Sequence, residues 1–169
     1  MSADVVYKIE IGYQDFTTRI LRVVKQNFLL YIPDALLIVL LIIPPYNLEK
    51  TLSIIGGLLI LGIRDIIIMK RNIKYLNNFE VHNGLVYFSI LKYSDVYIND
   101  HDHITNIDME WIESKNNCRL VIKRKNSIIH TQYAIGYWTK NRLKELYKEF
   151  KEIKNDNNIE DIFRGPILN

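Results

Sequence analysis

The chain has 169 residues, a formal net charge of +3 and one cysteine, Cys118. This length suits one domain, or a small domain with a membrane anchor, and so small a positive charge does not by itself indicate nucleic-acid binding. A single cysteine excludes an internal disulfide and favours a reducing compartment. Hydrophobic residues make up 49% of the chain but are concentrated in 28–46 and 52–69, which argues against one soluble domain.

The N-terminal segment, residues 1–27, is predicted to form a strand and then an amphipathic helix. Alternating polar and apolar residues in VVYKIEI indicate the strand, which Gly12 ends. In the helix, apolar side chains share one face, and Arg19, Arg22 and Lys25 are expected on the other. Such a helix either lies in the membrane interface or extends the first span into the cytoplasm. The segment is too polar for a signal peptide.

Two membrane spans are predicted within residues 28–69. The runs 28–46 and 52–69 approach the roughly 20 apolar residues that a transmembrane helix needs, and the short connection between them requires an antiparallel hairpin. Ser53 and Gly57 would allow close packing of the two helices. The alternative is a pair of buried helices in a soluble bundle, but no other segment carries enough apolar surface to cover them.

Basic residues predict how these spans are oriented. They flank the spans on the outer ends and are nearly absent from the connection, so both chain ends are expected in the cytoplasm. The predicted location is therefore the bacterial cytoplasmic membrane, with a multi-pass chain. The flanking cations are Arg19, Arg22 and Lys25 before the first span and Lys70, Arg71 and Lys74 after the second.

Three charged residues lie within the apolar runs: Asp34, Arg64 and Asp65. In an antiparallel hairpin Asp34 and Arg64 fall at similar depth. A charge inside a bilayer costs several kcal/mol, so it normally pairs, faces a neighbour or snorkels. Three interpretations stay open: snorkelling of Arg64, an Asp34–Arg64 pair within or between subunits, or a polar path that opens on oligomerisation. Asp65 is expected to face elsewhere and, if the hairpin assembles with copies of itself, to be a contact between them.

After Tyr75 apolar and polar residues alternate with the two-residue period of β-strands. Residues 75–154 are therefore predicted to form a small antiparallel β-barrel with a closing helix. The fold class is thus α+β with a membrane hairpin. Asn83-Gly84 is a strong hairpin-turn signal, and residues 125–127 mark another turn. Residues 139–154 have helical period with Thr139 as N-cap, and 155–169 are expected to be a loose tail. The strand patterns are FEVH, LVYFSIL, DVYI, HITNIDMEW, CRLVIKRK and SIIHTQYAI, and VVYKIEI could add a seventh.

His101, Asp102 and His103, together with His82 and His130, suggest a metal site, because histidines two apart on a strand face the same side. No further ligand motif accompanies them. Solvated turn residues are therefore the preferred interpretation of the HDH segment, and no metal or cofactor is expected.

Five basic residues form a candidate ligand-binding patch, for lipid headgroups or a phosphorylated ligand. Side chains alternate along a strand, so Lys123 and Lys125 point to one side and Arg124 to the other. This favours a solvated hairpin end over a binding patch. No nucleophile–base pair, glycine-rich phosphate loop or paired-carboxylate motif is present, so no enzyme activity is expected. The five residues are Lys92, Arg119, Lys123, Arg124 and Lys125.

Three stretches of the chain carry a resemblance to a known family: VYKIEIGYQDF, DHITNIDMEW and YAIGYWTKNRLKELYKEF. In these stretches and in the order of its elements, the chain resembles the YcxB-like membrane proteins, which carry a bacterial PH-like domain. The resemblance covers most of the chain and implies a PH-like barrel beneath the membrane with no settled activity. Trp111 departs from it, because such proteins tend to have their tryptophan ahead of the central strand.

The layout of two spans followed by a small β-barrel is also similar to antiphage (CBASS-type) effectors, in which a cyclic nucleotide binds the barrel and drives assembly of the spans. The expected function is a non-catalytic membrane protein whose cytoplasmic domain binds a ligand or partner and couples it to the hairpin. The alternatives are such an effector, which would disrupt the membrane, and a toxin or bacteriocin immunity protein. The expected partners are the lipid bilayer, other copies of the chain, and a cyclic nucleotide or a protein, but no nucleic acid.

Overall fold

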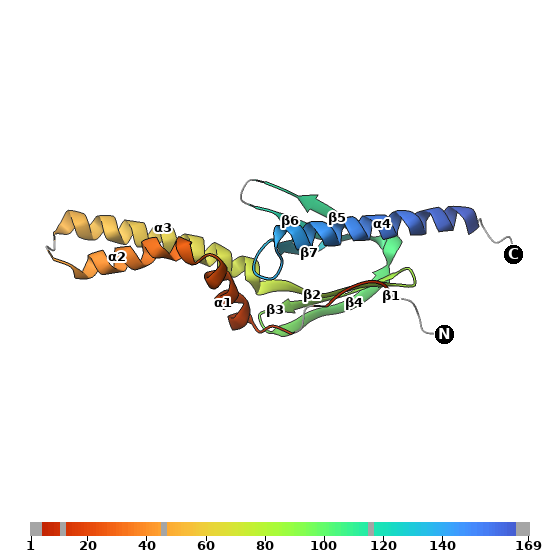
Figure 1. The fold of residues 1–169 in the computed structure, drawn as a ribbon, viewed down its shortest axis with the longest axis horizontal. Helices are drawn as coiled ribbons and strands as arrows, with labels where there is room; N and C mark the ends of the chain where they lie inside the picture. The colour runs from red at the N-terminus through yellow and green to blue at the C-terminus, as the bar shows by residue number, and fades with distance from the viewer. Residues whose placement is uncertain (1–4, 11–12, 45–46, 115–116, 165–169) are drawn as a thin grey trace.

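The computed structural model describes residues 5–10, 13–44, 47–114 and 117–164. Within these residues the chain is α+β, with four α-helices and two antiparallel sheets. Two apolar helices project as an arm from the part of the molecule that contains the sheets (Figure 1). The predicted α+β class and antiparallel strands are therefore confirmed.

The larger sheet contains β1 (Val5–Glu10), β2 (Lys74–His82), β3 (Leu85–Lys92) and β4 (Asp95–His103), in the order β1-β2-β3-β4. The first strand of the chain is thus an edge strand paired with β2, although the helical arm separates them in sequence. Asn83 and Gly84 connect β2 to β3 with positive φ angles of 50° and 71°, as a two-residue turn between twisted strands requires. The hairpin predicted at this dipeptide is confirmed.

The smaller sheet contains β5 (Ile107–Ile112), β6 (Arg119–Arg124) and β7 (Ser127–Tyr133), in that order, after the short 3-10 helix η2 (Ile104–Asn106). A second two-residue turn, with φ angles of 46° and 70°, joins β6 to β7. Among the described residues the strand ladders stay within each sheet, so the two sheets do not close into a barrel.

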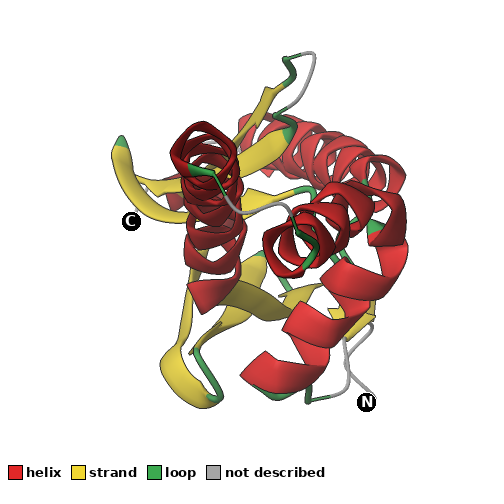
Figure 2. Ribbon diagram, turned by 90° about the vertical axis from the view of Figure 1, so that its left-hand side faces the viewer, coloured by secondary structure: helices red, strands yellow, loops and turns green. Residues whose placement is uncertain are grey.

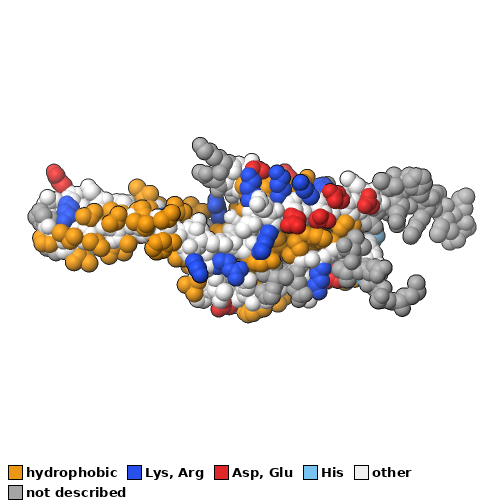
Figure 3. Space-filling view, viewed as in Figure 1, with side chains coloured by type: hydrophobic (Ala, Val, Ile, Leu, Met, Phe, Trp, Pro, Cys, Tyr) orange, Lys and Arg blue, Asp and Glu red, His pale blue; other side chains and the backbone are white. Residues whose placement is uncertain are grey.

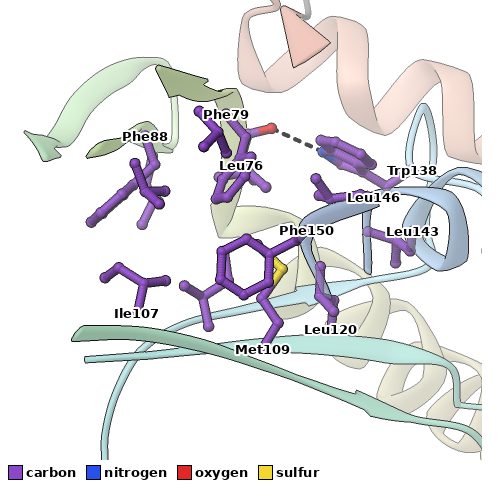
Figure 4. Close-up of a cluster of buried hydrophobic side chains, with 14 of the residues drawn as sticks. Leu76, Phe79, Phe88, Ile107, Met109, Leu120, Trp138, Leu143, Leu146 and Phe150 are labelled. Carbon is purple, nitrogen blue, oxygen red and sulfur yellow. Dashed lines mark hydrogen bonds between the residues drawn. The ribbon is translucent and has the colours of Figure 1, made fainter. Parts of the chain in front are cut away.

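Helix α4 (Lys140–Arg164) fills the space between the splayed sheets (Figure 4). Phe150 lies between Phe79 of the larger sheet and Met109 of the smaller one, with the Phe79 and Phe150 ring centroids 6.0 Å apart. The indole Nε1 of Trp138 donates a hydrogen bond to the Leu76 carbonyl at 2.9 Å. A helix inserted in this way contributes the core contacts that direct sheet closure would otherwise make.

The boundaries of α4 differ partly from expectation. Thr139 caps the helix as predicted, because its Oγ1 accepts a hydrogen bond from the Arg142 N–H at 3.4 Å. The helix then runs to Arg164, so the loose tail expected from 155 is wrong as far as that residue. No glycine or proline interrupts the chain before Gly165-Pro166, and polar residues alone do not end a helix. Residues 165–169 lie outside the described part.

The arm begins after α1 (Phe16–Gln26), with the 3-10 helix η1 (Phe28–Tyr31), α2 (Ile32–Ile42) and α3 (Leu48–Ile73). Among the described residues α3 alone is long and apolar enough to cross a membrane as one helix. A second span exists only if α1 and Phe28–Ile42 count as one span bent by 86°. Residues 45–46 of the predicted first span lie outside the described part.

The helices α2 and α3 lie side by side, as seen in Figure 1 and along the arm from its free end in Figure 2. Gly57 faces α2, and a Cβ atom there would come within 2.9 Å of Leu37 Cδ1. Apolar side chains cover the visible face of the arm (Figure 3), and only 6% of the most apolar window of α3 is buried. The arm thus exposes a large apolar surface.

Candidate functional site

Asp34, Arg64 and Asp65 meet on the arm and form one charge cluster. The Arg64 Nη2 atom lies 2.6 Å from Asp34 Oδ2, and Arg64 donates to Asp65 Oδ1 from Nη2 at 2.9 Å and from Nε at 3.0 Å. The third guanidinium nitrogen, Nη1, donates to the Leu30 carbonyl at 2.7 Å, and the Tyr31 ring lies 4.9 Å from the guanidinium carbon. Every nitrogen of the Arg64 guanidinium is therefore engaged.

Asp65 corrects an expectation from the sequence. It is expected to face away from Arg64, whereas it binds Arg64 itself. A contact of Asp65 with another copy stays a prediction. Adjacent helical residues point about 100° apart, but an arginine side chain is long enough to fold back along the helix and reach its neighbour. The charge cluster then holds two carboxylates and one guanidinium, a formal net charge of −1 within the apolar stretch of the arm.

The junction between the arm and the sheets is centred on Arg19, which is only 1% exposed. Its Nη1 donates to the Asn72 carbonyl at 2.9 Å, in the last turn of α3, and its Nη2 donates to the Tyr93 carbonyl in the β3–β4 turn. The guanidinium carbon lies 4.7 Å from the centre of the Tyr75 ring. One side chain of α1 thus connects α3 and the larger sheet.

This position of Arg19 is a further correction, because the residue was expected on the polar face of its helix. Two backbone carbonyls at the junction accept hydrogen bonds from it, and burial next to these acceptors outweighs the cost of leaving water. Burial lowers the pKa of the Arg19 guanidinium from its usual value, although an arginine stays charged. No local pattern distinguishes Arg19 from Arg22 one turn later.

Other contacts cap α1 and hold its two ends against the β3–β4 turn and the β7–α4 connection. Asp15 caps the helix by accepting from the Thr18 N–H at 2.8 Å, and the Ser94 Oγ accepts from the Phe16 N–H at 3.0 Å. At its other end, the Gln26 amide donates to the Gly136 carbonyl at 3.1 Å. With the 86° bend after α1, these contacts exclude α1 as a straight continuation of α2.

The five basic residues of the predicted ligand patch do not come together. Arg119 and Arg124 lie at opposite ends of β6, and Lys92 ends β3 in the other sheet. Arg124 is held by Asp100 and Asp102 at 2.8 Å each, and Lys123 by Glu110 at 2.6 Å. The hydrogen bond from Arg124 lowers the pKa of Asp100.

The predicted histidine group is also dispersed. His101, Asp102 and His103 belong to strand β4 rather than to a turn, and His101 stacks on Tyr87 with ring centroids 5.3 Å apart. No group of three or more His, Cys, Asp or Glu side chains suited to a metal occurs in the described residues. The strand assignment corrects the turn part of the interpretation, because DHDH continues the pairing register of β4 with β3, while His101 and His103 are solvent-exposed as expected.

His130 is the buried member of this group, at 2% exposure. Its Nε2 lies 3.3 Å from Gln132 Oε1, which also accepts from the Leu76 N–H at 2.8 Å. Because that oxygen is an acceptor, we assign the imidazole proton to Nε2, which leaves Nδ1 as a buried acceptor without a partner in the described residues. Burial lowers the pKa of His130 to about 4; the bond to Gln132 opposes the shift and the Lys74 charge adds to it.

The charge cluster and the junction are two of the places in the described chain where charged side chains connect different elements. The sequence predicted that the first contains charged residues, but it did not predict Arg19 in the second. No protein-family model matches the chain, and neither the curated proteins nor the solved structures contain a match.

Proposed function

We propose that the chain is a non-catalytic protein of the bacterial cytoplasmic membrane, in which residues 28–69 cross the bilayer twice and both chain ends are cytoplasmic. Its cytoplasmic domain binds a ligand or partner, and the Arg19 junction transmits that binding to the arm. The junction is the observation that carries the proposal, because it joins the two parts through buried, charge-assisted hydrogen bonds.

Exposed apolar side chains support the membrane part of the proposal. Leu59, Ile60 and Ile63 of α3 are 60–70% exposed, and a patch of this size on a protein in water would promote aggregation. At 26 residues α3 is about 39 Å long, enough for a hydrocarbon core of about 30 Å. Tyr93 and Tyr97 are exposed beside the end of α3, where interfacial tyrosines belong.

The path of the chain supports the coupling part. Helix α3 ends at Ile73 and β2 begins at Lys74, so no loop separates the arm from the larger sheet. Movement of the sheet relative to the membrane would have to bend this connection or break the bonds of Arg19. Seven strands followed by a helix in the described residues also fit the suggested likeness to YcxB-like proteins with a PH-like domain, although the sheets stay open.

The antiphage effector is the second candidate, and the charge cluster favours it. Polar groups within an apolar arm give the arm a way to bind other copies, or to admit water, once a signal rearranges Arg64. A cyclic oligonucleotide would be that signal, with binding in the cytoplasmic domain. The two candidates differ in whether ligand binding makes the membrane leak.

Cysteine labelling tests the membrane topology. On a Cys118→Ser background, Glu49→Cys near the tip of the arm should react with a membrane-impermeant maleimide in intact spheroplasts. Lys125→Cys, in an exposed turn of the domain, is the matched site and should react only after lysis. Labelling of Lys125→Cys in intact spheroplasts, or protection of Glu49→Cys, would contradict the proposed orientation.

Vesicles containing the full chain separate the two candidates. A panel of cyclic di- and trinucleotides is added, and both binding and release of an entrapped dye are followed. Binding together with dye release that depends on Arg64 identifies the effector. Absence of nucleotide binding, with harmless overexpression in cells, excludes it and leaves the anchored binding protein. Arg19→Met should uncouple any ligand response of the arm, whereas Arg22→Met should not.

A further inference from the structure

A groove of about 570 Å³ lies where α3 ends and β2 begins, with β7 as its other wall. Lys70 and Arg71 line it from α3, Lys74 lines it from β2, and His130 and Tyr133 line it from β7. In Figure 3 basic side chains (blue) gather where the apolar arm meets the sheets. The groove is separate from the charge cluster and from the Arg19 junction.

The groove carries uncompensated positive charge. None of its lining residues is acidic, and within the described part of the chain Lys70, Arg71 and Lys74 form no ion pair. Arg71 lies 5.1 Å from the centre of the Tyr133 ring, and Lys74 lies 4.9 Å from that of Tyr97. The negative end of the α3 dipole balances part of this charge, but it acts mainly within the last turn, and Lys74 is already in β2.

His130 adds a second kind of group to the same groove. It is buried in the wall formed by β7, with its proton on Nε2 and with Nδ1 as an acceptor lacking a described partner. An unpaired buried acceptor costs free energy, so a hydroxyl or another donor from a ligand would stabilise it. The groove therefore presents cations for an anion, and His130 in its wall holds an enclosed acceptor, Nδ1, which a donor reaches only when the side chains that cover it move aside.

We propose that this groove binds the headgroup of an anionic phospholipid, with the phosphate held by Lys70, Arg71 and Lys74. A headgroup hydroxyl, such as those of phosphatidylglycerol, supplies the donor for His130. The proposal rests on the membrane function above, in which the groove directly follows the apolar residues of α3 and so lies at headgroup depth. A bound lipid would contact both α3 and β7, and would thereby stabilise the junction.

Short-chain lipids test this with the full chain in detergent micelles. Dihexanoyl phosphatidylglycerol is titrated while thermal stability is followed; dihexanoyl phosphatidylcholine and free glycerol phosphate are titrated in parallel. We expect phosphatidylglycerol to raise Tm and the other two to have little effect. If glycerol phosphate binds as well as phosphatidylglycerol, the ligand is a free phosphate and not a lipid. If no probe binds, the groove is not a binding site for this headgroup.

Matched double variants locate the binding. Lys70→Gln with Lys74→Gln should weaken phosphatidylglycerol binding about 30-fold, because each basic side chain near an anionic surface contributes about fivefold. Lys144→Gln with Lys148→Gln removes two exposed lysines of the same spacing from α4 and should leave binding unchanged. Equal effects of the two pairs would show that the groove is not the site.

His130→Gln tests the hydroxyl contact. The variant should reduce the preference for phosphatidylglycerol over dihexanoyl phosphatidic acid, which lacks the glycerol headgroup; an unchanged preference overturns the role of His130. The labelling of Glu49→Cys is an independent readout of topology. Correct labelling without lipid binding means that the groove proposal alone fails, whereas wrong labelling means that the membrane function fails.

Discussion

Arg64 shows how one side chain can pair with two carboxylates in two apolar helices, Asp34 in α2 and Asp65 in α3. Its three nitrogens contact Asp34, Asp65 and the Leu30 carbonyl, so removing it leaves several groups without their partner at once. Replacing Arg64, Asp34 and Asp65 together by leucine leaves only apolar side chains at this place in the arm. In a bilayer the first change is costly and the second is not, because an unpaired charge is far less soluble in hydrocarbon than a leucine.

We therefore expect Arg64→Leu to destabilise the detergent-solubilised chain by about 3 kcal/mol, and the triple change Arg64→Leu, Asp34→Leu, Asp65→Leu to restore most of that loss. Thermal unfolding, with the yield of monodisperse protein, measures both. Lys70→Leu is the control, since it removes a cation from the same helix without leaving a carboxylate unpaired. Equal loss in the single and triple variants would contradict the pairing.

Arg19 should be far more sensitive to substitution than Arg22. Arg19→Met leaves the Asn72 and Tyr93 carbonyls without this donor, at a cost of about 2–4 kcal/mol in unfolding free energy. Arg22 is half-buried, and its guanidinium carbon lies 6.0 Å from the centre of the Tyr137 ring, so Arg22→Met should cost under about 1 kcal/mol. Hydrogen exchange of α1 should rise in the first variant alone.

His130 makes stability depend on pH. Its folded pKa is about 4, whereas an unfolded histidine titrates near 6.5, so between these values the unfolded chain binds the extra proton. The contribution of His130 is complete above about pH 6.5 and is lost as pH falls toward 4, by about 3 kcal/mol in all.

Denaturant titrations at several pH values measure this loss. His130→Leu should flatten the slope between pH 6.5 and 4, whatever it does to stability at neutral pH. His101→Gln, a change at an exposed histidine, should retain the slope. A slope that survives in His130→Leu would assign the acid sensitivity to other groups.

At the scale of elements, the packing of α2 on α3 depends on Gly57. Gly56 and Gly57 are adjacent in the same helix, yet a Cβ at Gly57 would approach Leu37 Cδ1 to 2.9 Å, whereas one at Gly56 would have nothing within 4 Å. The same substitution at Gly56 and at Gly57 therefore changes helix propensity equally, and only the packing against α2 differs. Ser53 and Gly57 were expected to allow close approach of the helices; Gly57 makes the contact, and Ser53 is exposed.

Gly57→Ile should thus destabilise the arm by about 1–3 kcal/mol relative to Gly56→Ile, because the added branch must displace Leu37. Thermal unfolding in one detergent compares the two variants directly. Adding Leu37→Ala to Gly57→Ile should recover part of the loss by making room. If the two isoleucine variants behave alike, α2 and α3 do not pack through this position.

At the scale of the whole molecule, the sheet region depends on the N-terminal strand. β1 pairs with β2 along the edge of the larger sheet, and Tyr7 and Ile9 pack against its core. Strands from both sides of the arm therefore build one domain. An uncovered edge of β2 would be a template for pairing with other chains.

Replacing residues 1–12 by a glycine–serine segment of equal length should consequently cause aggregation and lower the thermal stability of the domain. Light scattering and unfolding of the full chain measure this. Lys8→Ala is the control, because it removes a surface ion pair of 3.8 Å with Glu80 while keeping the strand. A monodisperse, equally stable replacement would show that β1 is dispensable.

Features that depend on near neighbours in the chain were determined by the sequence alone. The Asn83-Gly84 turn, the apolar stripe of α4 and its Thr139 cap follow from local backbone preference and period. The apolar runs and the charges within them were equally evident, because they need no knowledge of the fold. The spacing of Arg64 and Asp65 in the sequence did not show that the two side chains bind each other.

Only the tertiary structure decided the features that depend on distant neighbours. Arg19 is buried because α3 and the β3–β4 turn bring two carbonyls to it, and β1 joins β2 because the arm returns to its starting point. The sheets stay open because α4 inserts Phe150 between them. Burial, pairing and closure are settled by which surfaces meet, and the local pattern of a sequence does not contain that information.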